Sequence, residues 1–273
     1  MSDIHDPHRE RSHDRSRQQE ADLLVVIPCL NEALNIGVIV ASVIRCGAVC
    51  VVCDGGSSDN TAAQAAAAGA SVIKAGPGRA TQMNAGAQFG FECFPNSRWL
   101  LFLHADVGLP VVNDIQVTAT QATHWVALTA GASREWARFD IRLVASTGGG
   151  KGWYRWQERY SAALLPIVSR LMNWRSALTG ICTGDQGLLV TREMFVRVEG
   201  FPAIALMEDI EISRRLKAVA GRPFRLRDQL HVSARRWERD GIFRTILSMW
   251  WTRLRYFTGT PPDVLHKSYY GKQ

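Results

Sequence analysis

One stretch of the sequence decides the fold: Val49-Cys50-Val51-Val52-Cys53-Asp54-Gly55-Gly56-Ser57-Ser58-Asp59-Asn60-Thr61. It begins with a wholly apolar run, which is typical of a strand buried on both faces of a parallel sheet. The run stops at an acid, two glycines and several helix-capping residues, so a helix is expected to follow. Asp54 would then lie at the carboxyl end of a parallel strand, where open α/β sheets bind their ligands. A well-capped turn without a ligand would explain the same segment.

Strands and helices alternate around this stretch. We expect strands at Leu23–Pro28, Val49–Cys53, Ser71–Lys74 and Trp99–Leu103, and helices at Ala33–Arg45, Thr61–Ala68 and Arg79–Phe91. The alternation predicts an α/β fold with a mostly parallel, doubly wound sheet. After Asp106 the pattern is irregular. There we expect strands at Val126–Thr129 and Phe139–Leu143, a mostly helical segment at Trp153–Met172 and a second regular stretch at Gln186–Leu216.

The sequence predicts one domain between two extensions. Residues 1–20 are polar and lack apolar periodicity, so we expect a disordered N-terminal extension. The domain would span residues 21–240, and residues 241–273 would form a C-terminal amphipathic helix and tail. In Ile242–Phe257 a narrow polar stripe lies opposite a broad apolar arc with tryptophans, a pattern typical of a helix at a membrane interface. Packing on the domain or across a dimer explains the pattern equally well.

The positive charge of the chain is concentrated near its C-terminal end. Of 273 residues 47% are hydrophobic, enough for a full core, and the formal net charge is +7. Residues 214–273 contain fourteen Lys and Arg against four Asp and Glu. This excess fits a solvated surface or an anionic partner such as a diphosphate or an acidic membrane surface. No nucleic-acid-binding motif accompanies it, so we expect no nucleic-acid partner.

The six cysteines do not form a convincing metal or redox motif. Cys50 and Cys53 have C-x-x-C spacing, but both lie in the expected buried strand, whereas reactive thiolates need an accessible turn. Packing is the better explanation. Free cysteines, the lack of a signal peptide and the lack of an apolar run near ~20 residues favour a cytoplasmic protein.

Polar residues follow two expected strands of the N-terminal half. The first strand ends at Pro28, and Asn31 and Glu32 follow it, near Asp54. The strand Trp99–Leu103 ends in His104-Ala105-Asp106, and alternation directs His104 and Asp106 to one side. A carboxylate in that position can hold Mg²⁺ or Mn²⁺, with waters and phosphates completing the shell. An ordinary turn would also account for each segment.

Two further clusters lie in the C-terminal half. Met207-Glu208-Asp209-Ile210-Glu211 opens a helix, where the helix dipole favours acids and can keep a general base ionised. Arg235-Arg236-Trp237 follows the strand-like Leu230–Ala234. Its guanidinium groups could hold a diphosphate and its indole could form an apolar wall, unless the pair is simply a surface feature. Arg79 is a further candidate for phosphate or base contact, and His231 for a metal.

Taken in order, these segments resemble the inverting glycosyltransferases of family 2, which have the GT-A fold with its Rossmann-like sheet. The matching features are Pro28–Glu32, Asp54–Thr61, Asp106, Glu208-Asp209 and Arg235-Arg236-Trp237. More narrowly, the chain is similar to a bacterial subgroup associated with radical-SAM/selenium-domain clusters and arsenosugar biosynthesis. That similarity rests on Gly78–Ala87, Leu101–Asp106, Thr183–Gln186, Gly200–Pro202, Leu206–Asp209 and Ser233–Glu238. The resemblance covers about residues 22–270.

The resemblance implies a single GT-A domain that transfers a sugar from a nucleotide-diphosphate sugar to a hydroxyl, with an irregular acceptor-side half. The donor would be bound by Pro28, Asn31, Glu32, Asp54, Gly56, Ser57, Arg79 and Asp106, and Asp106 would hold the Mg²⁺ or Mn²⁺. Asp185, Glu208, Arg235, Arg236 and Trp237 would lie at the acceptor and the diphosphate. Asp209 would be the general base. The acceptor is either lipid-linked or a small molecule.

One departure from the family and three rival functions remain. His104 stands where the family has the first acid of its metal motif, so whether His104 or His231 joins the metal site stays open. A nucleotidyltransferase would need a basic, glycine-rich loop after the first strand, where Pro28–Glu32 stands. A dinucleotide dehydrogenase would need G-x-G-x-x-G there. A non-catalytic nucleotide-sugar or membrane-surface binding protein of the same fold is the third class. If Ile242–Phe257 lies at a membrane interface, we expect peripheral contact with the inner face of the plasma membrane.

Overall fold

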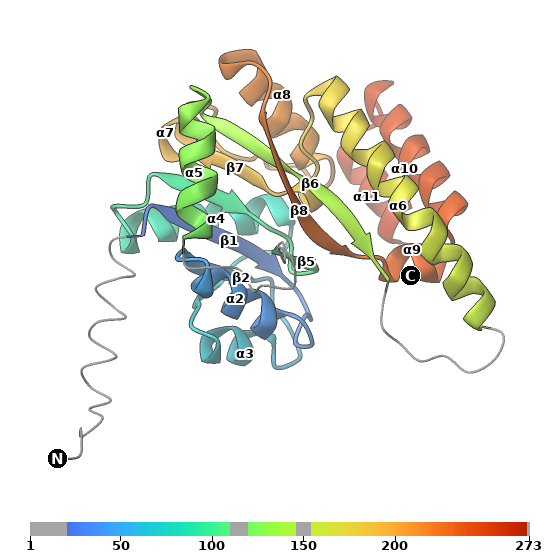
Figure 1. Ribbon diagram of the computed structural model, residues 1–273, viewed down its shortest axis with the longest axis horizontal. Helices are drawn as coiled ribbons and strands as arrows, with labels where there is room; N and C mark the ends of the chain where they lie inside the picture. The colour runs from blue at the N-terminus through green and yellow to red at the C-terminus, as the bar shows by residue number, and fades with distance from the viewer. Residues whose placement is uncertain (1–20, 110–119, 146–153, 272–273) are drawn as a thin grey trace.

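The computed structural model describes residues 21–109, 120–145 and 154–271, with side chains left out for 154–162 and Tyr270. The predicted N-terminal extension lies outside the described residues. Figure 1 shows a single sheet with helices on both faces, and with the C-terminal helices gathered at one end.

The N-terminal half alternates strands and helices as the sequence predicts. Its elements are β1 (Leu23–Cys29), α2 (Ile36–Arg45), β2 (Val49–Asp54), α3 (Thr61–Ala67), β3 (Ser71–Lys74), α4 (Arg79–Cys93) and β4 (Trp99–Phe102). Every pairing among β3, β2, β1 and β4 is parallel. The carboxyl ends of β1 and β2 lie together, with Cys29 opposite Asp54. Asp54 therefore lies at the carboxyl edge of the parallel strands, where the sequence analysis expected it.

The C-terminal half completes a mixed sheet. Its elements are β5 (Val107–Gly108), α5 (Gln121–Gly131), β6 (Trp136–Val144), α6 (Tyr154–Thr179), the 3₁₀ turn η1 (Gly184–Gln186), β7 (Leu188–Thr191), α7 (Arg192–Arg197), α8 (Glu208–Ala220), β8 (Phe224–Ser233), α9 (Arg235–Asp240), α10 (Ile242–Phe257) and α11 (Pro262–Tyr270). The eight described strands run in the order β3-β2-β1-β4-β7-β6-β8-β5. β7 is antiparallel to both β4 and β6, and β5 is antiparallel to β8. The α/β class is confirmed, and the parallel character belongs mainly to the N-terminal half.

The predicted strand Val126–Thr129 is wrong, because these residues belong to helix α5. The run is short and apolar, so its composition alone favours a strand. However, the buried residues of α5 are Ala122, Trp125, Val126 and Thr129, which is the i, i+3, i+4, i+7 spacing of one helical face. Trp125 packs edge-to-face on Phe139 of β6, with ring centroids 4.9 Å apart. Packing on the sheet therefore stabilises the helix.

Two hydrophobic cores lie on opposite faces of the sheet. One joins the sheet to α2, α3, α5, α6 and the start of α10, and the other joins it to α4, α7 and α8. Cys50 belongs to the first core and Cys53 to the second, so their side chains point to opposite faces. Burial raises the pKa of the Cys53 thiol to about 12. The packing interpretation of this pair is thus supported.

Helix α4 approaches the sheet closely because it carries glycines where it crosses the strands. A Cβ added at Gly86 would lie 2.4 Å from Cys53 Sγ and 2.5 Å from Val26 Cγ1. A Cβ at Gly90 would lie 2.2 Å from Leu24 Cδ2.

No helix in the described part of the chain is long and apolar enough to cross a bilayer.

Candidate functional site

The loops after β1 and β2 are fastened together by hydrogen bonds. Asn31 adopts a left-handed backbone (φ 55°), and its Oδ1 accepts a hydrogen bond from Ser58 N at 2.9 Å. In return, Asn31 N donates to Ser57 Oγ at 2.9 Å. Gly55 N donates to Cys29 O at 2.9 Å. The two loops therefore form one rigid unit at the carboxyl edge of the sheet.

Asp54 is buried within this unit. Both of its carboxylate oxygens accept a hydrogen bond from Ser57 N, at 3.2 Å each. Gly56 makes the turn possible, since its backbone has φ 97°, a conformation that a side chain would strain. Pro28, Asn31, Gly56 and Ser57 are thus gathered around Asp54, as the sequence predicts for one end of a donor site.

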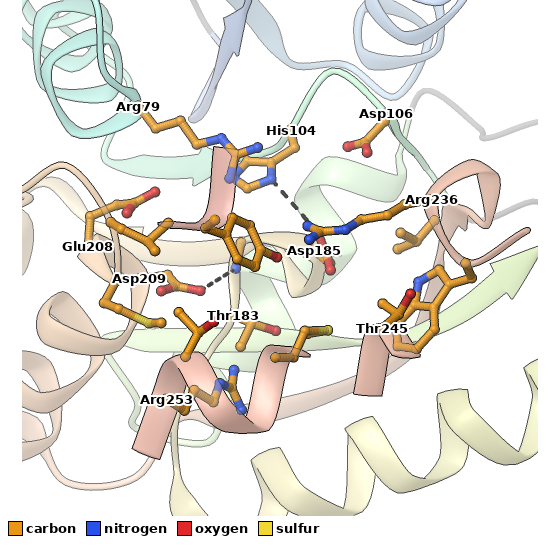
Figure 2. A pocket seen from close by; sticks show the side chains of 18 of the residues that line it. Arg79, His104, Asp106, Thr183, Asp185, Glu208, Asp209, Arg236, Thr245 and Arg253 are labelled. Carbon is orange, nitrogen blue, oxygen red and sulfur yellow. Dashed lines mark hydrogen bonds and ion pairs between the residues drawn. The ribbon is translucent and has the colours of Figure 1, made fainter. Parts of the chain in front are cut away.

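A cavity of about 300 Å³ lies further along the same edge (Figure 2). Its walls come from segments far apart in the sequence, including the ends of β4 and β8, the η1 turn, the start of α8 and the helices α9, α10 and α11. Seven predicted site residues or candidates line it: Arg79, His104, Asp106, Asp185, Glu208, Asp209 and Arg236. Trp237 lines it as well. The structure therefore brings most of the predicted acceptor and diphosphate residues together.

Other predicted residues lie outside the lining of this cavity. Pro28, Asn31, Glu32, Asp54, Gly56 and Ser57 belong to the fastened loops instead. Glu32 connects the two regions, because its Oε2 lies 3.3 Å from Arg235 Nη2. His231 pairs with Gly108 within the sheet and is not among the lining residues. Of the two histidines considered for a metal site, His104 alone faces the cavity.

Asp209 is held in a fixed position at the start of α8. Its Oδ2 accepts a hydrogen bond from Gly184 N at 3.1 Å. The preceding Met207 has a left-handed backbone (φ 71°), which is rare for a side chain of its size and is typical of constrained sites. Ser213, one turn further along α8, accepts a hydrogen bond at its Oγ from Cys182 N at 3.0 Å, which links α8 to the segment before η1. Asp209 thus lies in the first turn of α8 and is tied to the start of η1.

His104 is uncharged in this environment. Burial, followed by the nearby Arg79 guanidinium, lowers the pKa of His104 to about 3. Its Nδ1 lies 3.8 Å from Asp185 Oδ1, a contact longer than a hydrogen bond (Figure 2). Gly184 allows this close arrangement, because a Cβ there would lie 2.1 Å from His104 Cε1. A neutral imidazole is able to ligate a metal ion.

The acids of the cavity repel one another. Burial and then the Asp106 carboxylate raise the pKa of Asp185 to about 6. Burial and then Asp209 raise the pKa of Glu208 to about 7. Arg79 lowers both values, so its positive charge faces these acids. A cation placed among them would relieve the repulsion.

The residues that line the cavity fit a hard divalent cation that would take most of its ligands from the substrate. Among the described residues, no group of three His, Cys, Asp or Glu side chains is arranged to hold a metal ion. Asp106 and Asp185 nevertheless offer oxygen donors near each other. Mg²⁺ commonly binds through one or two carboxylates, with phosphate oxygens and waters completing its octahedron.

Arginines border the Asp106 side of the cavity. A second hollow, of about 440 Å³, adjoins the first and is lined by Asp106, Ser233, Arg235, Arg236 and Arg239. The Arg236 guanidinium stacks over the ring of Tyr269 from α11, 4.3 Å from its centroid. Trp237 is mostly buried in the core below. This arrangement can bind a polyanion beside Asp106.

The sequence-based prediction missed the wall formed by the C-terminal helices. Thr245, Met249, Thr252 and Arg253 of α10 line the cavity, as does Tyr269 of α11. The polar stripe of Ile242–Phe257 was visible in the sequence, and it was the only signal that pointed to this role. Arg253 lies close enough to Arg175 of α6 to lower the pKa of that buried guanidinium.

The sequence matches no protein-family model and no curated protein. Its structure, in contrast, is similar to several solved structures. A mannosyltransferase from Pyrobaculum calidifontis, PcManGT, in complex with GDP-Man and Mn²⁺, has a TM-score of 0.55 at 15% identity, with 97% of this chain and 76% of that chain covered. TarS residues 1–349 from S. aureus have a TM-score of 0.53 at 14% identity, with 78% and 60% covered. The chain thus corresponds to 60% of that TarS fragment.

A third similar structure is glucosyl-3-phosphoglycerate synthase from Mycobacterium tuberculosis, in complex with Mn²⁺, UDP-Glc and phosphoglyceric acid. It has a TM-score of 0.50 at 16% identity, with 89% of this chain and 83% of that chain covered. The fold is the GT-A fold. At these identities the similarity establishes the GT-A architecture, and the chemistry depends on the site residues themselves.

Proposed function

We propose that this protein is a metal-assisted, inverting glycosyltransferase that moves a sugar from a nucleotide-diphosphate sugar to a hydroxyl acceptor. The observation that carries the proposal is the cavity at the carboxyl edge of a GT-A sheet, which collects Asp106, Asp209 and Arg236 from three distant segments. The GT-A neighbours support it, since their complexes contain GDP-Man with Mn²⁺ or UDP.

The fastened loops would bind the nucleoside. The Asp54 carboxylate lies at the end of β2, next to the backbone amide of Ser57, which holds its orientation. Asp54 would accept hydrogen bonds from the base or ribose, and the loop residues Pro28, Asn31, Gly56 and Ser57 would shape that end. Glu32, joined to Arg235, would connect the nucleoside end with the diphosphate end.

The diphosphate would lie between Asp106 and the arginines. Asp106, with Asp185 beside it, would hold a Mg²⁺ or Mn²⁺. When bound, this cation supplies electrostatic stabilisation of charge on the diphosphate oxygens. Arg79, Arg236 and Arg239 would stabilise the same charge as the leaving group departs, the role in which fixed cations contribute most to catalysis. Trp237 would form an apolar wall beside the acceptor.

Asp209 would be the general base. It would remove the proton from the acceptor hydroxyl while the oxygen attacks the anomeric carbon from the side opposite the diphosphate, which inverts the configuration. The bond to the diphosphate oxygen breaks as the new glycosidic bond forms. The Gly184 amide fixes Asp209, and Glu208 would contact the acceptor from the neighbouring position.

We also propose, from the motif resemblance, that the chain belongs to family 2 and to the bacterial subgroup associated with arsenosugar biosynthesis. We further propose a cytoplasmic setting, which the free cysteines favour. The acceptor is either a small molecule or a lipid-linked alcohol.

A donor screen tests the proposed function. UDP-, GDP- and dTDP-sugars are incubated with the full chain and Mn²⁺ without an acceptor, and release of the nucleoside diphosphate is measured. We expect slow hydrolysis of one donor class, stopped by EDTA and restored by Mn²⁺ or Mg²⁺. A chain that consumes none of the donors and whose melting temperature responds to none of the nucleotides would not be a glycosyltransferase.

A further inference from the structure

Helix α10 combines a face packed on the protein with an exposed apolar face. On the packed face Thr245 and Thr252 are buried, and their hydroxyls donate to the carbonyls of Gly241 and Ser248 at 2.8 and 2.7 Å. Ile242, Ile246 and Met249 pack on the core. Six large apolar side chains are exposed: Phe243, Leu247, Trp250, Trp251, Leu254 and Phe257. Trp250 is 70% exposed. These six lie at the i, i+4, i+7, i+8, i+11, i+14 spacing of one helical face.

Helix α6 exposes a second apolar stripe. Ile167, Leu171, Trp174 and Leu178 are all exposed, at the i, i+4, i+7, i+11 spacing of one face. Trp174 is 63% exposed. The two helices belong to the same end of the molecule, where Figure 1 shows α6 crossing α10 and α11. Arg253 of α10 also lies within electrostatic reach of Arg175 on α6. Soluble monomers rarely leave so many large apolar side chains in water.

The charged side chains exposed on the described parts of these helices are arginines. Arg170 of α6 and Arg244 of α10 are exposed, whereas Arg175 is mostly buried and Arg253 lines the cavity. The described side chains of α6, residues 163–179, and those of α10 include no acid. Tryptophan, phenylalanine and leucine accompanied by arginine are typical of helices that lie in the interface of an anionic bilayer.

We infer that the exposed stripes of α6 and α10 dock on an anionic lipid bilayer. A second copy of the chain fits this surface less well, because the described side chains of the two stripes would bring exposed arginines against arginines and include no acid to pair with them. Anionic headgroups provide the missing counter-charges, and the aromatic rings enter the headgroup region. The buried face of α10 lines the cavity. Docking therefore places the cavity about one helix diameter, ~10 Å, from the bilayer surface.

Vesicle flotation with the full chain tests the inference, and it requires no nucleotide, so it is independent of the proposed function. We expect flotation with vesicles of phosphatidylcholine containing phosphatidylglycerol, weaker flotation with phosphatidylcholine alone, and weakening by salt. Leu247→Ser with Trp250→Ser should lower the affinity at least about tenfold, since each removes a large apolar group from the interface. Arg170→Gln and Arg244→Gln should each lower it about fivefold, as expected for ~1 kcal/mol per basic residue.

The matched control is Val38→Ser with Val219→Ser, which removes exposed apolar side chains from α2 and α8. This control should float like the unchanged chain, and thermal melting should show that all variants fold. The inference is overturned if the chain floats with neither vesicle, or if the control lowers flotation as much as the α10 variant. It is also overturned if sedimentation shows a dimer that the α10 variant dissociates while neither protein floats.

Discussion

Four acids meet in the cavity, and their surroundings make them chemically different. Asp185 and Glu208 have pKa values raised to about 6 and about 7 by burial and by their acidic neighbours. Asp209 has a backbone amide donor and lies in the first turn of α8. The raised pKa values keep Asp185 and Glu208 protonated to a higher pH than a free carboxylic acid.

The first prediction concerns Asp209. Asp209→Asn should lower transfer about 10²- to 10⁴-fold, the usual contribution of a general base, because the amide cannot accept the proton. The carboxamide oxygen can still accept the hydrogen bond from Gly184, so nucleotide binding should be unchanged. Initial rates and thermal shifts with nucleotide measure the two effects. Unaltered turnover in this variant would remove Asp209 from the base role.

The second prediction concerns Glu208 and pH. A folded-state pKa of about 7 exceeds the usual value of 4.5, so the folded state binds more protons than the unfolded state between these values. The folded state is therefore most stable, with respect to this group, below about pH 4.5, where Glu208 is protonated. It loses this stability as the pH rises through about 7. Glu208→Gln should be more stable than the unchanged chain at pH 8, by on the order of 3 kcal/mol, and similar to it at pH 4. Urea unfolding at the two pH values measures this. An equal difference at both would contradict it.

At the scale of elements, the sequence-based prediction succeeded where strands were short, apolar and followed by turn residues. It predicted the strands β1, β2, β3 and β4 and the polar residues that follow them, because the local sequence pattern determines both features. It failed at α5, where composition favoured a strand and packing on β6 favoured a helix. The antiparallel insertion of β7 joins segments about ninety residues apart, and no local pattern encodes such a pairing.

The close packing of α4 provides the third prediction. Gly86→Ala should destabilise the fold by about 1–3 kcal/mol, because the new Cβ overlaps Cys53 and Val26 and the core resists expansion. The matched control is Gly131→Ala at the end of α5, where no atom lies within 4 Å of the added Cβ. The control should be neutral or stabilising by up to ~1 kcal/mol, since alanine favours helix more than glycine does. Equal losses in both variants, measured by chemical unfolding, would refute close packing at Gly86.

At the scale of the whole molecule, the site is assembled from both halves of the chain. The N-terminal half supplies Asp54, Arg79 and Asp106, and the C-terminal half supplies Asp209 and the arginines of α9. Motif order in the sequence anticipated this assembly. The closing wall from α10 and α11 was not anticipated, because a helix with a broad apolar arc is expected to bury that arc, whereas α10 buries Thr245 and Thr252 and leaves six large apolar side chains exposed.

Isothermal titration of UDP and GDP into the full chain tests the donor site most directly. With Mn²⁺ present, we predict one binding site for one of the two nucleotides. EDTA, or Asp106→Asn, should weaken that binding at least about tenfold, which corresponds to ~1.4 kcal/mol and is modest for a lost charged contact to a diphosphate. Binding of neither nucleotide, or binding that is unchanged by both EDTA and Asp106→Asn, would contradict a metal-assisted nucleotide-sugar site.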